Sequence, residues 1–195
     1  MYIIIEGIDT AGKSTQLDIL KKNHTDIIFT KEPGGTELGS KIREIVLNGE
    51  AKSKVAEMFL FLADRAEHSF EVIKKNKESI VISDRGLLSG IAYAQAPLEI
   101  AISLNIMALN GVMPDKVILL ELNEDELKNR LSQKDNHDNI EQRGVQYLLE
   151  IQTRMVEAIN MINDMSEKKI DLLKIDARKP IDEISIEIEQ FLSKS

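Results

Sequence analysis

The chain of 195 residues contains no cysteine and no tryptophan. Without cysteine it can form no disulfide, no thiol nucleophile and no cysteine-ligated metal site. Histidine is scarce as well, and the spacing of His24, His68 and His137 is not that of a shared metal site. A zinc enzyme is therefore not expected.

Positive charge is in the minority. The 25 Lys and Arg residues against 33 Asp and Glu residues give a net charge of −8 and a pI near 5.0. This balance argues against a broad surface for nucleic acid or for an anionic membrane. The chain also lacks a basic-then-apolar signal at its start and any apolar run long enough to span a membrane. We therefore expect a cytoplasmic protein that binds neither nucleic acid nor membrane.

Short apolar, β-branched runs alternate with helical patterns along the whole chain. This alternation predicts an α/β fold, with a parallel sheet of about five strands and helices on both faces. With 43% hydrophobic residues, residues 1–195 suit one domain. Strands are expected at 2–5, 26–30, 79–83, 116–122 and 171–175. Helices are expected from residue 14 onward and at 38–46, 55–73, 87–95, 97–110, 124–131, 140–162 and 180–192.

The first fifteen residues carry the strongest motif. Residues 7–14 read GIDTAGKS and fit the phosphate-binding loop G-x-x-x-x-G-K-[ST], between an expected strand and an expected helix. An ordinary glycine turn before a helix is the alternative, but a chance match in this context is rare. The sequence therefore predicts a nucleoside triphosphate site formed by Gly7, Ile8, Asp9, Thr10, Ala11, Gly12, Lys13, Ser14 and Thr15.

The residue types of this loop explain its chemistry. Glycines let backbone N–H groups approach phosphate oxygens, and the helix start points its positive end at the same anion. Lys13 is expected to reach the β- and γ-phosphates, and the Ser14 hydroxyl to bind Mg²⁺.

A second group of polar residues follows the expected strand 79–83. Asp84 and Arg85 stand at its carboxyl end, which is the side of a parallel sheet where ligands bind. From the residues alone, a helix-capping salt bridge between the two is the alternative.

Further motifs match one known family in order and spacing. Four stretches carry the match: I-E-G-I-D-x-A-G-K-S-T at 5–15, T-K-E-P-G-G-T at 30–36, F-L-A-D-R at 61–65 and D-R-x-x-x-S-x-x-A-Y at 84–93. With the I-D-A-x-x-P turn at 175–180, these stretches resemble bacterial thymidylate kinases over nearly the whole chain. The resemblance implies a three-layer P-loop NTPase fold and a homodimer that packs helices such as 55–73 or 91–110. It also implies transfer of the ATP γ-phosphoryl group to dTMP, with Mg²⁺, giving dTDP and ADP for dTTP synthesis.

The resemblance assigns roles around the acceptor phosphate and sugar. It implies that Asp9 accepts a hydrogen bond from the 3′-hydroxyl, and that Arg85 binds the acceptor phosphate while Asp84 helps to hold the Mg²⁺ shell. The acceptor loop contains Glu32 and Pro33, with Arg43 near the acceptor phosphate. On sequence alone, the loop could be only a tight turn and Arg43 a solvated side chain.

For the nucleoside, the resemblance places Phe61 stacked on thymine and Arg65 hydrogen-bonded to its edge. The two are four residues apart and share one helix face. Tyr93 would crowd the sugar 2′ position and favour deoxyribose, and Arg130 would pack on the donor adenine. The alternatives are a core phenylalanine, a packed tyrosine and a surface arginine.

The chain departs from the family pattern at three places. Gly86 replaces an aromatic residue or histidine, and Gly90 replaces a polar residue that helps to read thymine, so that Ser89 or water would substitute. The lid, about 132–143, contains no arginine before its last residue, Arg143. We choose Lys134 as the catalytic lid cation and expect Asp9, Lys13 and Arg85 to be the other catalytic residues. Glu141 resembles an acid of the lid helix that the family places near the acceptor. His137 is the other lid candidate.

Three other functions are compatible with a phosphate-binding loop. Another small-molecule kinase would not need E-P-G-G-T or Asp9. A guanine-specific switch would normally carry Asn-Lys-x-Asp, which the chain lacks. A non-catalytic nucleotide-binding module would leave the Asp-Arg pair and the polar lid without a purpose.

Overall fold

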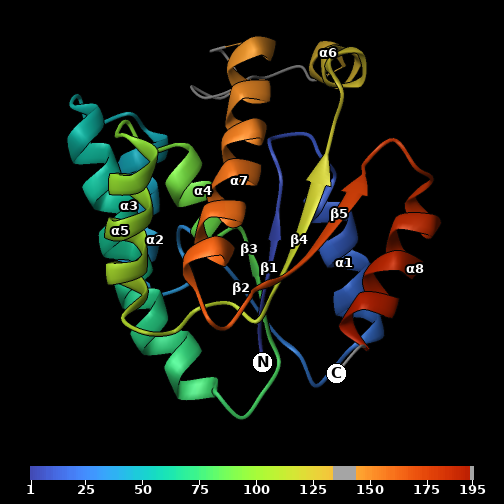
Figure 1. Cartoon of the computed structure of the whole chain (residues 1–195), viewed down its shortest axis with the longest axis horizontal. Coiled ribbons are helices and arrows are strands. Elements are labelled where there is room, and N and C mark those ends of the chain that lie inside the picture. The colour runs from blue at the N-terminus through green and yellow to red at the C-terminus, as the bar shows by residue number, and fades with distance from the viewer. Residues whose placement is uncertain (134–143, 194–195) are drawn as a thin grey trace.

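In the computed structural model, five parallel strands form one sheet in the order β2-β3-β1-β4-β5 (Figure 1). The structure describes residues 1–133 and 144–193. The strands are β1 (Tyr2–Glu6), β2 (Ile28–Lys31), β3 (Val81–Asp84), β4 (Lys116–Glu121) and β5 (Asp171–Asp176). The predicted five-stranded parallel sheet is confirmed, although β2 and β3 each begin two residues later than expected.

The middle of the sheet is covered on both faces. Every residue of β1 is buried, and β4 is buried up to its last residue. Such continuous burial explains why these strands read as unbroken apolar runs instead of alternating patterns. Helices α1 and α8 pack together on one face, whereas α4, α5 and α7 cover the other (Figure 1).

The helices lie close to the predicted ranges. They are α1 (Lys13–Asn23), α2 (Glu37–Leu47), α3 (Lys54–His68), α4 (Leu87–Ala92), α5 (Leu98–Leu109), α6 (Glu124–Ser132), α7 (Val145–Met165) and α8 (Ile181–Leu192). Side chains cap several of them: the Thr36 hydroxyl accepts from Gly39 N at the start of α2, and Asn123 accepts from Glu126 N at the start of α6.

Three helix predictions need correction. The expected helix 55–73 is α-helical only to His68, and continues as a π-helix (Ser69–Ile73) and a 3-10 turn (Lys74–Asn76). The wider turn brings the buried Ser69 hydroxyl to the Leu109 carbonyl, 2.7 Å away on α5. The helix expected at 87–95 ends at Ala92, before Pro97 caps α5. Helix α7 runs to Met165 and begins after Gly144, whose φ of 92° is not helical; residues 140–143 lie outside the described part of the chain.

The strand register brings three loops to one edge of the sheet. Asp84 at the end of β3 pairs with Ile5 of β1 on one side and with Lys31 of β2 on the other. The segments that follow these strands therefore start side by side at the carboxyl edge. They are the phosphate-binding loop, the Asp-Arg turn and the Glu-Pro-Gly-Gly loop.

None of the helices in the described ranges is long and apolar enough to cross a membrane.

Candidate nucleotide and acceptor site

The phosphate-binding loop leads directly into helix α1. Gly12 precedes the helix with φ 94°, a left-handed conformation that favours glycine, and it offers no side chain to cap the first turn. The N–H groups of that turn are therefore open to a ligand, and together with the helix dipole they form a site for an anion. Ser14 lies exposed in the same turn.

Lys13 is folded back over the loop. Its Nζ donates hydrogen bonds to the carbonyl oxygens of Gly7 at 2.9 Å and Ile8 at 3.0 Å. Burial, together with the nearby positive charge of Arg85, lowers the pKa of the Lys13 ammonium to about 8. A polyphosphate beside Lys13 would offset both effects, so the free site is electrostatically prepared for an anion.

Arg85 connects the Asp-Arg turn to the phosphate-binding loop. Its guanidinium pairs with the Asp9 carboxylate and donates to the Gly7 carbonyl at 3.0 Å. It also donates to the Ser89 hydroxyl at 3.0 Å. Arg85 is therefore ion-paired with Asp9 of the phosphate-binding loop and not with Asp84, while its bond to Ser89 also ties it to helix α4 (Leu87–Ala92).

A buried carboxylate that sequence reasoning missed supports this arrangement. Glu6, the last residue of β1, is fully buried and accepts hydrogen bonds from the Ser89 backbone N–H at 3.0 Å and hydroxyl at 2.5 Å. Burial raises the pKa of Glu6 even though Ser89 acts in the opposite direction. The sequence signal that could have indicated this role is an acidic residue at the end of an otherwise apolar strand.

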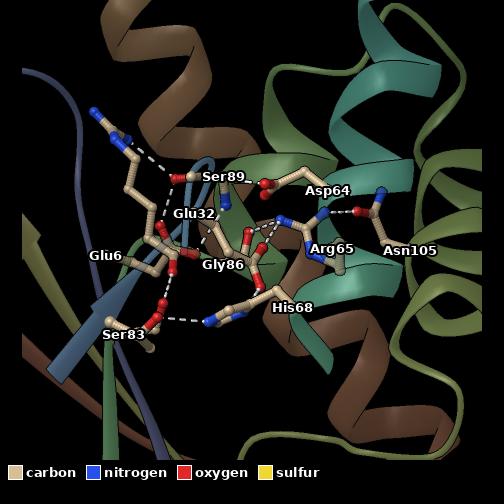
Figure 2. A network of polar contacts seen from close by, with 12 residues as sticks. Glu6, Glu32, Asp64, Arg65, His68, Ser83, Gly86, Ser89 and Asn105 are labelled. Atoms are coloured by element: carbon tan, nitrogen blue, oxygen red, sulfur yellow. Dashed lines mark hydrogen bonds and ion pairs between the residues drawn. The ribbon is translucent and has the colours of Figure 1, made fainter. Parts of the chain in front are cut away.

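Glu32 lies at the centre of a buried polar network (Figure 2). Its carboxylate contacts Arg65 Nη2 at 2.6 Å and His68 Nδ1 at 2.7 Å. Burial alone would raise the pKa of Glu32, but Arg65 and His68 outweigh it and the pKa is lowered. The carboxylate is therefore held ionised between two side chains of helix α3.

The same helix also holds Gly34 of the Glu-Pro-Gly-Gly loop and Thr30 of strand β2. The Asp64 carboxylate accepts from the Gly34 N–H at 2.9 Å, and His68 Nε2 lies 2.7 Å from the Thr30 hydroxyl. Burial raises the pKa of Asp64 to about 6. The sequence analysis did not predict either role. Asp64 lies within the F-L-A-D-R stretch, and His68 follows it four residues later on the same helix.

A cavity of about 500 Å³ opens beside these loops. Every predicted substrate-binding residue that the structure describes lines it: Asp9, Glu32, Pro33, Arg43, Phe61, Arg65, Arg85, Ser89, Gly90 and Tyr93. Glu141 lies outside the described residues. Residues not predicted, such as Lys52, Met58 and Asp64, complete the wall.

Two aromatic residues, Phe61 and Tyr93, line the cavity. Phe61 is half-buried and lines the cavity instead of joining the hydrophobic core. Tyr93 is also half-buried. The Arg85 guanidinium carbon lies 5.7 Å from the centre of its ring, and the ring centre of Tyr147 on α7 lies 6.5 Å from it. Tyr93 therefore both packs and faces the site.

The departure at Gly86 has a local explanation. A Cβ at this position would lie 2.8 Å from Ile4 Cδ1 in the central strand. The backbone carbonyl of Gly86 instead accepts a hydrogen bond of 2.6 Å from Arg65 Nη2. The turn after β3 is thus packed tightly on the sheet and serves the site through its backbone.

On the opposite side of the phosphate-binding loop, Arg130 joins three segments. Its guanidinium donates to Glu126 at 2.6 Å, to the Thr10 carbonyl at 3.0 Å and to the Ala177 carbonyl at 2.6 Å. Arg130 is therefore not a solvated surface residue. It connects the phosphate-binding loop to the I-D-A turn after β5.

The oxygen ligands available for a metal are few. Within the described residues, no group of three or more His, Asp or Glu side chains could hold a metal ion. Mg²⁺ commonly takes only one or two protein oxygens, with phosphates and water as the other ligands. The Ser14 hydroxyl and Asp84 fit that pattern, since Oδ1 of Asp84 is buried without a hydrogen-bond partner among the described residues.

The model of the thymidylate kinase family matches residues 5–188 of the chain. The chain belongs to the thymidylate kinase family. Thymidylate kinase of Aliarcobacter butzleri is 57% identical over 194 residues, with 99% of each chain covered. Thymidylate kinase of Sulfurimonas denitrificans is 54% identical over 192 residues, with 96% of this chain and 97% of the relative covered. The family resemblance inferred from the motifs is confirmed.

A solved thymidylate kinase structure has the same fold. The crystal structure of the enzyme from Ehrlichia chaffeensis superposes with a TM-score of 0.70 at 24% identity and covers 99% of this chain and 98% of that chain. The predicted P-loop fold is therefore confirmed. Two residues to which the thymidylate kinase resemblance gave roles, Lys134 and Glu141, lie outside the described residues, as do His137 and Arg143.

Proposed function

We propose that this chain transfers the γ-phosphoryl group of ATP to dTMP, forming ADP and dTDP. One observation carries the proposal beyond family membership. A single cavity runs from Asp9 and Arg85 at the phosphate-binding loop to Phe61 and Arg65 on α3. It is therefore contiguous with the place where the donor's phosphates would lie, as in-line transfer requires.

The acceptor's sugar and phosphate would occupy the inner end of this cavity. Asp9 would accept a hydrogen bond from the 3′-hydroxyl, in keeping with its pairing with Arg85, which turns the carboxylate away from open solution. Arg85 and Arg43 would bind the phosphate. Arg43 is already anchored, because its Nη1 donates to the Pro33 carbonyl at 3.0 Å.

The nucleoside would lie along α3. Phe61 offers a ring at the cavity wall for stacking on thymine, and Arg65 offers a guanidinium held by Glu32 for hydrogen bonds to the base edge. Tyr93 lines the same cavity, in keeping with a role in excluding a 2′-hydroxyl.

On the donor side, Lys13 and the first turn of α1 would bind the β- and γ-phosphates. Arg130 would border the adenine, supported by its bonds to Thr10 and Ala177. Ser14 and Asp84 would hold Mg²⁺, which, when bound, draws negative charge from the phosphate oxygens.

The transfer step needs no catalytic base, because a phosphate monoester near neutral pH is mostly dianionic and already nucleophilic. Lys13 and Arg85 would concentrate positive charge around the transferring group, which is the main requirement of this chemistry. Lys134 in the lid keeps the proposed role of a closing cation and Glu141 that of an acid near the acceptor.

We also propose that the chain acts as a homodimer. Helices α3 and α5 contact each other and lie together at one end of the molecule (Figure 1). They and the π-helix expose large apolar side chains, each by half or more: Val55 50%, Phe59 53%, Phe70 57%, Ile100 51% and Met107 70%. Helix pairing across a two-fold axis would cover this surface. Light scattering measures the mass of the purified protein in solution and so tests whether two chains associate.

Product analysis tests the reaction directly. The protein is incubated with Mg²⁺, ATP and dTMP, and the nucleotides are separated by ion-exchange chromatography. Equal amounts of ADP and dTDP are expected. ADP without dTDP would indicate hydrolysis and refute the transferase assignment, whereas transfer only to a different acceptor would favour another small-molecule kinase.

A further inference from the structure

Arg65 is held by protein groups on two sides. The side chain is 4% exposed, and its Nη2 contacts both the Glu32 carboxylate and the Gly86 carbonyl, each at 2.6 Å. Its Nη1 donates a hydrogen bond to Asn105 Oδ1 from helix α5 (Figure 2). Nε has no hydrogen-bond partner among the described residues. The guanidinium is therefore oriented before any ligand arrives.

Asn105 is itself fixed. It is 1% exposed and anchors its amide by donating from Nδ2 to the Ala101 carbonyl, one turn earlier, at 2.7 Å. This bond leaves Oδ1, an acceptor, facing the arginine. Asn105 is not among the residues that line the cavity, so any effect on a ligand has to pass through Arg65.

The space for this pair exists because residue 90 is glycine. A Cβ at Gly90 would lie 2.5 Å from Asn105 Oδ1 and closer still to Arg65 Nη1. A side chain from the cavity-lining helix α4 and an amide from α5 therefore cannot both occupy this volume. In this chain the polar group beside Arg65 comes from α5.

We propose that Asn105 is a positioning residue for pyrimidine recognition, which holds Arg65 as a hydrogen-bond donor toward the 4-carbonyl group of the bound base. The proposal rests on the proposed dTMP kinase function. It also explains how the chain orients Arg65 without a polar side chain at position 90. A 4-amino pyrimidine offers no acceptor in that place, so the fixed guanidinium discriminates between dTMP and dCMP.

The test compares two substitutions at one position. Asn105→Leu keeps the volume and removes the acceptor, whereas Asn105→Asp keeps an acceptor for Arg65. We expect Asn105→Leu to raise KM and Kd for dTMP roughly tenfold, in line with loss of one hydrogen bond to a charged group. It should also lower the ratio of kcat/KM for dTMP to kcat/KM for dCMP by a similar factor. Both kcat and the KM for ATP should stay within about twofold of the wild-type values. Asn105→Asp should recover most of the dTMP affinity.

Two further variants keep the result unambiguous. Asn160→Leu makes the same change at an exposed site of α7 and should alter neither KM. If Asn105→Leu does not fold, Gly90→Ala is used instead. Its added methyl group would disturb the hydrogen bond between Arg65 and Asn105 without changing α5, and should give the same selective rise in the KM for dTMP. A rise in both KM values together, or none in either variant, would overturn the proposal. If the wild type itself does not use dTMP, the proposed function fails instead.

Discussion

Arg85 and Asp9 form an ion pair across 76 residues of sequence, between the turn after β3 and the phosphate-binding loop. The pair explains how a carboxylate can sit inside a loop that binds a triphosphate. A neighbouring guanidinium compensates its charge, and Asp9 lines the acceptor cavity. This placement supports the proposed contact between Asp9 and the acceptor.

Asp9 can be tested with a substrate that lacks one hydroxyl. In the wild type, 3′-deoxythymidine monophosphate should show a kcat/KM about 10–100-fold below that of dTMP, as expected for losing a hydrogen bond to a carboxylate. In Asp9→Ala the two substrates should differ by less than about threefold, because the partner is already missing. Steady-state kinetics with both substrates gives the coupling; equal penalties in the two proteins would remove Asp9 from 3′-hydroxyl recognition.

Lys13 is the residue most directly tied to the donor. Lys13→Ala should lower kcat by about 100-fold or more, since the proposed mechanism loses the buried cation that would stabilise charge on the transferring group. The melting temperature should stay within a few degrees of the wild type, because the bonds lost go to loop carbonyls and not to the core. Lys22→Ala, an exposed lysine on the same helix, serves as the control. Near-normal turnover of Lys13→Ala would disprove the phosphate-binding assignment.

Some parts of the site could be predicted from the sequence because their residues are adjacent along the chain. The phosphate-binding loop is one run of eight residues between a strand and a helix, and each of its functions follows from local backbone geometry. The sheet was equally predictable, because strands buried on both faces read as apolar runs. The family motifs extended this reading to Phe61 and Arg65.

The polar network around Glu32 was not readable in this way. His68 and Asn105 reach it from positions 36 and 73 residues farther along the chain, and their contacts depend on how α3 and α5 pack. Nothing local in the sequence distinguishes a buried asparagine that serves an arginine from an exposed one on a helix surface. The hydrogen bond between Arg65 and Asn105, and the space that Gly90 leaves for it, are seen only in the folded chain.

Asp64 predicts a pH-dependent stability. Its pKa of about 6 in the folded protein exceeds the ordinary value of 3.8, so between these values the folded state binds more protons than the unfolded state. Its favourable contribution is therefore complete below about pH 4 and is lost as the pH rises through 6. Asp64→Asn mimics the neutral form and keeps an acceptor for Gly34. It should increase the free energy of unfolding by about 1–3 kcal/mol at pH 8 and change it little at pH 4.

Urea unfolding of wild type and Asp64→Asn at both pH values measures this difference. Asp164→Asn, at an exposed position of α7, controls for the loss of one negative charge. A destabilised Asp64→Asn at pH 8 would show that the ionised carboxylate is needed to hold the loop, contrary to our reading.

The thymine methyl group should be read by the cavity around Phe61 and Met58. A methyl in an apolar pocket contributes about 1–3 kcal/mol, so dUMP should be a measurable substrate with a kcat/KM roughly 10–200-fold below that of dTMP. Competition between the two acceptors in one reaction measures the ratio. Equal use of dUMP would mean that the methyl group lies outside this pocket.

The most direct test of the account is acceptor-stimulated ADP release. Turnover of Mg²⁺-ATP is measured alone and with dTMP, dCMP, AMP or shikimate at equal concentration. We predict strong stimulation by dTMP and little or none by the others. Stimulation by another acceptor but not by dTMP would contradict the assigned base site while leaving the phosphate-binding loop intact. Slow turnover that no acceptor changes would contradict the kinase function itself.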